Sequence, residues 1–106
     1  MFDFLKKDET KVINVNDIDQ LIGKVELIDI REPYEYESRS LKNSKNIPMR
    51  TLLESPERYL SKDKVYYIIC HSGARSGRMV KYLAQQNFNV INVAGGIGSY
   101  VGPNMN

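Results

Sequence analysis

A β-branched and aromatic run at 65–69, Val-Tyr-Tyr-Ile-Ile, limits the folds open to this chain more than any other segment. Apolar and polar residues alternate too little there for a half-solvated strand, so we expect a strand buried on both faces. Over 76–86, apolar residues recur at the spacing of an amphipathic helix. A buried strand that leads through a short turn into a helix is typical of a parallel α/β sheet.

Shorter segments of the same kind lie on both sides of this pair. Asp17 followed by Gln20 has a capping-box pattern, which predicts a helix beginning there. Pro33 suits the first turn of a short helix over 34–38, and Asn87 suits a left-handed helix cap. The further strands are expected at 12–15, 25–30, 46–47 and 89–93, with one more helical stretch at 51–60 interrupted at Pro56. Strands that alternate with helices predict a parallel sheet covered on both faces.

The composition fits one ordinary globular domain over residues 1–106. The chain has 106 residues, of which 42% are hydrophobic and 26% charged. The formal net charge is only +2, and the Lys and Arg residues are scattered along the chain, which argues against a nucleic-acid surface. Mild basicity is compatible with a small anionic substrate.

The single cysteine, Cys70, excludes an internal disulfide and indicates a cytoplasmic protein. One Cys and one His are also too few for a closed structural zinc site, so we expect no metal and no other cofactor. Met1 to Lys7 does not form a secretory signal; it could be a short amphipathic anchor, but a frayed or docked terminus fits better. No apolar run is long enough to cross a bilayer, so no membrane partner is expected.

Cys70 directly follows the buried strand, at the edge where parallel sheets bind their ligands. Gly73 permits a tight turn that can aim successive N–H groups at an anion. The N-terminus of the following helix adds partial positive charge, and Arg75 adds a permanent cation. We therefore expect the pKa of Cys70 to lie below that of a free cysteine, so that the site stabilises a thiolate or an anionic sulfur bound to it.

Two simpler interpretations apply to the same residues. A free cysteine at the end of a strand can act as a small apolar residue without chemistry. The segment that follows Cys70 favours the reactive interpretation. His71 fits the polar wall of a pocket better than a general base, because neighbouring side chains in a loop often diverge.

The run from Cys70 to Ser76 matches the Cys-x-x-Gly-x-Arg-Ser/Thr active loop of the rhodanese family at every fixed position. The chain therefore resembles the small single-domain members of that family. The segment 27–36 is similar to the family's upstream Asp-x-Arg signature, and Asn46-Ile47-Pro48 and Gly95-Gly96-Ile97 are similar to two further landmarks. The resemblance runs from about residue 12 to about residue 100, with its motifs in the expected order.

The resemblance implies a rhodanese-like domain with a five-stranded parallel sheet flanked by helices. It also implies a sulfurtransferase cycle in which Cys70 takes sulfur from thiosulfate or a persulfide and passes it to a thiol or cyanide. The acceptor would be a protein thiol or a low-molecular-weight thiol. Asp29 and Arg31 would border the loop, and a structural ion pair fits them better than contact with substrate. The residues that would bind the persulfide or the anionic donor are His71, Ser72, Gly73, Ala74, Arg75 and Ser76.

The chain departs from the family pattern in two places. The family often has Gly-His-Ile-Pro-Gly-Ala before its third strand, whereas this chain has Arg-Ser-Leu-Lys-Asn-Ser at 39–44. After the paired glycines the family often has a tryptophan, where this chain has Tyr100. We expect both changes to alter the shape of the pocket and the choice of partner, without affecting the active loop.

Two other functions remain open on the sequence. Cysteine phosphatases and arsenate reductases of this architecture use Cys-x-x-x-x-x-Arg, one residue longer than the loop between Cys70 and Arg75. The shorter loop suits a single sulfur atom, and no general acid is evident, although Asp29 remains a candidate. The other alternative is a sulfur carrier or regulatory module that binds a partner and turns over slowly.

Overall fold

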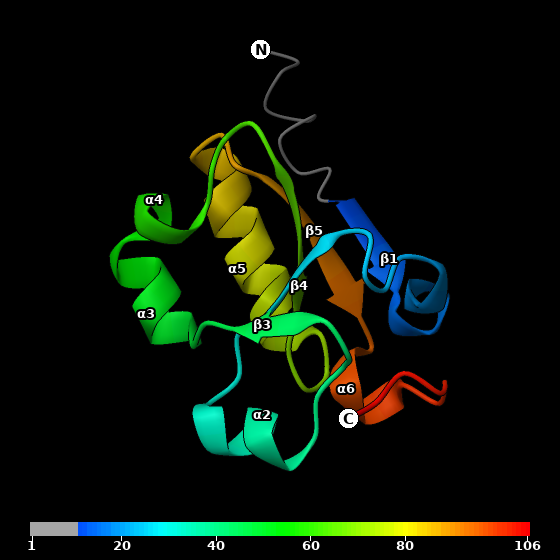
Figure 1. Cartoon of the computed structure of the whole chain (residues 1–106). Helices are drawn as coiled ribbons and strands as arrows, with labels where there is room; N and C mark the ends of the chain where they lie inside the picture. The colour runs from blue at the N-terminus through cyan, green and yellow to red at the C-terminus, as the bar shows by residue number, and fades with distance from the viewer. Residues whose placement is uncertain (1–10) are drawn as a thin grey trace.

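A five-stranded parallel sheet runs through the computed structural model, which describes residues 11–106 (Figure 1). Its strand order is β1-β5-β4-β2-β3, so β4 lies at the centre between β5 and β2. The strands are β1 (Lys11–Asn14), β2 (Glu26–Asp29), β3 (Ser44–Asn46), β4 (Val65–Ile69) and β5 (Asn89–Ala94). The predicted five-stranded parallel sheet is confirmed.

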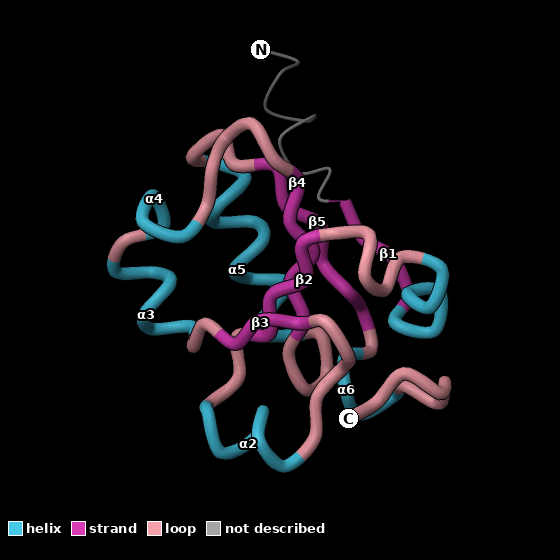
Figure 2. Tube along the Cα trace, in the orientation of Figure 1, coloured by secondary structure: helices cyan, strands magenta, loops and turns pink. Residues whose placement is uncertain are grey.

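Helices cover both faces of the sheet (Figures 1 and 2). The helices α3, α4 and α5 lie on one face, and η1 and α6 lie toward the other, while α2 lies below the sheet in this view. The bounds are η1 (Val15–Gln20), α2 (Pro33–Ser38), α3 (Met49–Glu54), α4 (Pro56–Tyr59), α5 (Ala74–Gln85) and α6 (Gly96–Ser99). Two predictions are confirmed: Pro33 lies in the first turn of α2, and the helical stretch that follows β3 is interrupted at Pro56.

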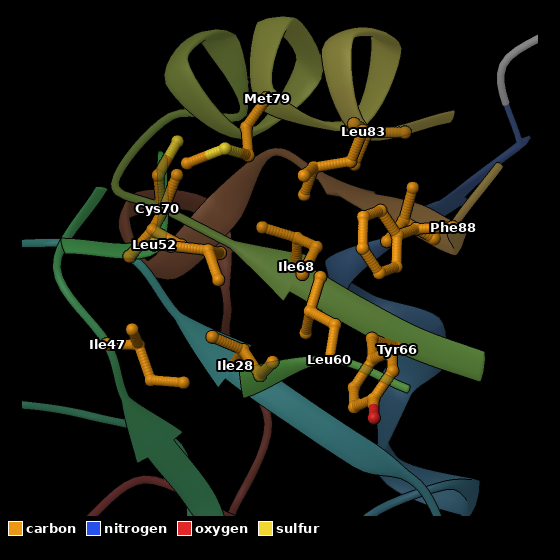
Figure 3. Packing of buried hydrophobic residues seen from close by; sticks show 13 residues of the cluster. Ile28, Ile47, Leu52, Leu60, Tyr66, Ile68, Cys70, Met79, Leu83 and Phe88 are labelled. Atoms are coloured by element: carbon orange, nitrogen blue, oxygen red, sulfur yellow. The ribbon is translucent and has the colours of Figure 1, made fainter. Parts of the chain in front are cut away.

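Strand β4 contributes to two separate hydrophobic clusters, which explains its lack of alternation. Tyr66 and Ile68 pack in the cluster under α5, whereas Tyr67 and Ile69 pack in the cluster beside η1 and α6. Successive side chains of a strand point to opposite faces, so a strand covered on both sides needs apolar residues throughout. Cys70, the residue directly after β4, belongs to the cluster under α5 (Figure 3).

The helix predicted to begin at Asp17 is different in the structure. Val15–Gln20 forms a 3-10 helix, and Asn14 caps it by accepting a hydrogen bond from the Asn16 N–H. Val15 and Ile18 are both fully buried, and side chains three residues apart lie above one another in a 3-10 helix. The capping box of Asp17 and Gln20 was therefore wrong: Asp17 lies inside the helix.

The C-terminal segment returns to the region where the sequence departs from the rhodanese pattern. Leu41 is fully buried and pairs with Met105 in an isolated antiparallel bridge. Hydrogen bonds also join the Lys42 N–H to the Asn104 carbonyl and the Asn106 N–H to the Ser40 carbonyl. Residues 40–42, within the segment that differs from the family pattern, thus pair with the chain's own C-terminal residues. The expectation for Met1 to Lys7 lies outside the described residues.

Candidate active site

Cys70 lies at the carboxyl end of the central strand and is fully covered, with 0% of its surface exposed. Figure 3 shows its side chain turned toward the helix that carries Met79. The expected position at the edge of the sheet is correct, but the thiol also belongs to the hydrophobic core. A substitution at Cys70 therefore affects packing as well as chemistry.

Three hydrogen-bonding groups surround the sulfur of Cys70. The Gly73 N–H donates to Sγ at 3.1 Å, and the Ser76 N–H donates to it at 3.3 Å. The Ser76 hydroxyl oxygen lies 3.3 Å from Sγ. The Gly73 donor comes from the turn after β4, and the two Ser76 groups come from the first turn of α5. A thiolate accepts hydrogen bonds and cannot donate, so this arrangement favours the ionised form.

The pKa of the Cys70 thiol is held below its ordinary value despite its burial. Burial is the largest single influence and raises the pKa, because it removes water from the charged form. The Ser76 hydroxyl and the N–H groups of Ser76, Gly73 and Ser72 lower it, and together they outweigh burial. The direction is the one expected from the sequence, but the role of the Ser76 hydroxyl was missed.

The left-handed conformation of Gly73 makes the turn over the sulfur feasible. Its φ is +98°, a region that residues with a Cβ rarely adopt. A Cβ there would also lie 3.0 Å from the Gly95 N and 3.4 Å from the Ala94 Cα. Gly73 therefore lets the loop pack against the end of β5, and α5 begins directly after it at Ala74.

The short helix α6 holds the active loop from the other side. The Ile97 N–H donates to the Cys70 carbonyl at 2.9 Å, and the Gly98 N–H donates to the His71 carbonyl at 2.8 Å. Gly96, with φ +63°, approaches these two carbonyls so closely that a Cβ would overlap them. With these carbonyls held by α6, the N–H groups of Gly73 and Ser76 face the sulfur. The sequence marked Gly95-Gly96-Ile97 only as a landmark and gave no sign of this contact.

The His71 side chain lies against α6. It is exposed, and a Cβ at Gly98 would lie 3.1 Å from its Nε2. No hydrogen bond joins its imidazole to Cys70 within the described part of the chain. This position agrees with the polar-wall interpretation of His71.

Arg75 pairs with a carboxylate from α2. Its Nη2 lies 3.7 Å from Glu35 Oε2, and the two side chains are 35% and 23% exposed. The other carboxylate oxygen of Glu35 accepts a hydrogen bond from the Glu32 N–H at 2.9 Å, which caps α2. The sequence did not single out Glu35, because nothing in the spacing of residues 35 and 75 indicates that they meet.

Asp29 and Arg31 form a buried ion pair at the carboxyl end of β2, the strand next to β4. Arg31 Nη2 lies 3.0 Å from Asp29 Oδ2, and the side chains are 4% and 0% exposed. The Arg31 N–H and Nε also donate to Asp29 Oδ1, each at 3.0 Å. Arg31 Nη2 donates in addition to the Arg39 carbonyl. These bonds occupy the pair within the β2–α2 connection, which fits the structural role.

Within residues 11–106, no group of three or more His, Cys, Asp or Glu side chains is arranged to hold a metal ion. None of the described helices has the length and apolarity needed to span a membrane.

The chain is similar to known proteins that carry a rhodanese-like domain. The family model for that domain matches residues 14–102. The Bacillus subtilis protein named "Putative sulfurtransferase YtwF" is 41% identical over 76 residues, 72% of this chain and 73% of the relative. A rhodanese-like domain protein from Staphylococcus aureus superposes with a TM-score of 0.80 at 26% identity, covering 92% of this chain and 97% of that one.

A longer relative matches only in part. The Bacillus subtilis protein named "Putative sulfur carrier protein YrkF" is 35% identical over 77 residues. The match takes in 72% of this chain but spans only 41% of that relative.

Proposed function

Because the chain belongs to the rhodanese-like domain family, we propose that it transfers sulfur through a persulfide formed on Cys70. The observation that carries the proposal is the sulfur's surroundings: hydrogen-bond donors from Gly73 and Ser76 lie within 3.3 Å of Sγ. They stabilise negative charge on a group that is otherwise buried in the core. A single anionic sulfur atom is the species that such a small ring of donors suits.

In the first half of the cycle, the Cys70 thiolate attacks the outer sulfur of thiosulfate. A new S–S bond forms at Sγ, the S–S bond of thiosulfate breaks, and sulfite leaves with the electron pair. The negative charge then resides on the outer sulfur of the persulfide, where the N–H groups of residues 71–76 would receive it. A persulfide donor would react in the same way and release a thiolate.

In the second half, an acceptor thiolate or cyanide attacks the outer sulfur of the persulfide. The bond between the two sulfurs breaks, and Cys70 leaves as the thiolate, ready for the next donor. The donors around Sγ stabilise this leaving group, because they lower the pKa of the Cys70 thiol. We propose that acceptors include protein thiols and low-molecular-weight thiols. The requirement for a reduced cysteine supports a cytoplasmic location.

The complete burial of Cys70 requires the loop to move before a donor reaches the sulfur. His71, Ser72 and Ala74 are exposed on the outer side of the loop, so solvent meets the loop there. Arg75, partly exposed at the start of α5, is a cation that can meet an arriving anion. We propose that it attracts an anionic donor such as thiosulfate and releases Glu35 as it does so.

A slow sulfur carrier is the second candidate. The observation that favours it is again the covered thiol, because a persulfide enclosed by the loop would be protected from small thiols. Such a module would load efficiently and would release its sulfur only to a partner that displaces the loop.

The test compares the unmodified protein with Cys70→Ala on thiosulfate and on an aryl phosphate. With cyanide or a thiol added as the sulfur acceptor, we expect Cys70-dependent release of sulfite from thiosulfate, with multiple turnovers if the protein is an enzyme and a single burst if it is a carrier. Phosphate release that depends on Cys70, without sulfite release, would show that the cysteine serves a phosphatase instead.

A further inference from the structure

A groove between α3 and α5 lies beside the active loop. Two adjoining hollows, of about 400 and about 500 Å³, share Met49 and Leu53 as lining residues. One hollow extends to Arg75 and the other extends along α5 to Tyr82. Figure 1 shows the two helices next to each other on the same face of the sheet. We call this surface the α3–α5 groove; its remaining lining residues are Glu32, Arg50, Glu54, Arg78 and Met79.

The floor of the groove is apolar. Met49 and Leu53 are half-buried and pack against the core cluster, and Tyr82 is 44% exposed. A small anion such as thiosulfate needs no apolar surface of this kind. An apolar side chain from a partner would remove these groups from water and gain free energy in proportion to the area covered.

The α5 side of the groove is basic. Arg75 and Arg78 of α5 line the groove, and the helix contains no acidic residue. Arg50 and Arg78 form no ion pair with a carboxylate in the described part of the chain, so both can meet an anionic partner. Glu32 and Glu54 lie at the Arg75 end, where they reduce the positive charge. The excess positive charge is therefore greatest toward Arg78.

We propose that the α3–α5 groove docks an acidic segment of a sulfur-acceptor protein, with one apolar side chain on its floor. This inference rests on the proposed sulfur transfer and names the partner for its second half. From Arg75 to Tyr82, α5 rises about 10 Å, which is the length of about three extended residues. A segment seated there holds the residue beyond it at the active loop, where an acceptor thiol has to arrive.

The first arm of the test measures binding to the unloaded protein, and so does not depend on sulfur chemistry. The probes are three fluorescent peptides: Glu-Leu-Glu-Gly-Cys, Lys-Leu-Lys-Gly-Cys and Glu-Ser-Glu-Gly-Cys. Fluorescence anisotropy should show the first binding at least about fivefold more tightly than the other two. Equal affinity of the acidic and basic peptides, or of the Leu and Ser peptides, would overturn the proposal.

Two charge reversals locate the binding site. Arg78→Glu lies in the groove, while Lys81→Glu makes the same change on the same exposed helix outside the residues that line the groove. Arg78→Glu should weaken binding of the acidic peptide by about fivefold, and Lys81→Glu should leave it within about twofold. An equal loss in both variants would show that the peptide responds to the helix's overall charge and not to the groove, which would overturn the assignment.

The second arm follows sulfur. After loading with thiosulfate, transfer to the acidic peptide should be faster than transfer to the basic one, and Arg78→Glu should remove the difference. Loading itself should be unchanged in Arg78→Glu. Normal loading with equal transfer to both peptides would contradict docking in the α3–α5 groove but would still support sulfur transfer through Cys70. Failure of the unmodified protein to load would contradict the sulfurtransferase, while the binding arm would still decide on the groove.

Discussion

Ser76 contacts the Cys70 sulfur through both its backbone N–H and its hydroxyl group, each at 3.3 Å. The N–H belongs to the first turn of α5, so its direction is fixed by the helix. The hydroxyl can rotate and donates once the sulfur is ionised, because a thiolate only accepts. One fully buried residue thus supplies two of the donors that offset the burial of the thiol.

Replacement of Ser76 by alanine should therefore raise the pKa of Cys70 while keeping the backbone donor. The thiolate fraction at neutral pH falls, and we expect alkylation and sulfur loading to slow by about tenfold. The measurement is the alkylation rate as a function of pH. Ser72→Ala is the matched control, because the Ser72 hydroxyl accepts from the Ala74 N–H and does not contact the sulfur. An unchanged pH profile in Ser76→Ala would show that the Ser76 hydroxyl does not lower the pKa of Cys70.

Gly96→Ala should disable the site by displacing the loop. A Cβ at Gly96 would overlap the carbonyls of Cys70 and His71, which α6 has to hold. A shift of about 1 Å at a reacting group can cost about 10²-fold in rate. Gly23→Ala is the control, since Gly23 also has positive φ (+81°) but its Cβ would meet nothing closer than 3.8 Å.

Both glycine variants should lose about 1 to 2 kcal/mol of stability through backbone strain. Gly96→Ala should lose more, and it alone should lose sulfur loading at a temperature where both are folded. Normal loading in a folded Gly96→Ala would show that α6 does not position the loop.

Glu35→Gln should strengthen the binding of thiosulfate. The carboxylate lies 3.7 Å from Arg75 and competes with an incoming anion, whereas glutamine keeps an oxygen for the Glu32 N–H that caps α2. Because exposed ion pairs contribute little, we expect KM for thiosulfate to fall by only about threefold, and less at high salt. Glu54→Gln is the control, because Glu54 lines the hollow that extends to Arg75 but forms no ion pair within the described residues. An equal effect of both variants would indicate a general charge effect.

Acid stability should depend on the contact between Tyr100 and Asp19. The Tyr100 hydroxyl and then the Asn104 side chain lower the pKa of Asp19, while burial opposes them. The folded pKa lies below the unfolded value, so this stabilisation is present above the ordinary pKa of 3.8 and is lost as the pH falls through the folded pKa.

Tyr100→Phe should therefore lower the melting temperature at neutral pH and reduce the fall in melting temperature between about pH 5 and about pH 2. Thermal unfolding at a series of pH values measures both effects. A parallel shift of the whole curve, with its acid slope unchanged, would mean that Tyr100 contributes packing alone. Tyr100 stands where the family often has a tryptophan. Its hydroxyl donates to Asp19 in η1 and accepts from the Asn104 N–H in the C-terminal segment, so it connects the end of α6 to both.

The fold was predictable from the sequence where the residues that favour a helix or strand locally are also the residues that the core buries. The run at 65–69 is apolar throughout because both faces of β4 are covered, and α5 is amphipathic because one of its faces is solvated. Asn87 adopts φ +71° at the end of α5, as a left-handed cap requires. The capping box at Asp17 failed because Asn14, earlier in the chain, caps a 3-10 helix instead.

The site was predictable as far as its local loop. Cys70, Gly73 and Ser76 are close in sequence, and their contacts follow from one turn between a strand and a helix. The contacts made by Glu35 and Gly96 come from segments far along the chain, and no spacing rule places them beside residues 70–75. The burial of the thiol likewise depends on residues of other elements, such as Leu52 of α3 and Met79 of α5, that belong to the same hydrophobic cluster.

The most direct test of the account is the intact mass of the protein after exposure to thiosulfate, before and after a reductant. We expect a gain of about 32 Da, the mass of one sulfur atom, that the reductant reverses and that peptide mapping assigns to Cys70. Cys70→Ala and Cys70→Ser should gain nothing while remaining folded by circular dichroism. No gain in the unmodified protein, or an equal gain in a folded Cys70 variant, would contradict a persulfide mechanism at this residue.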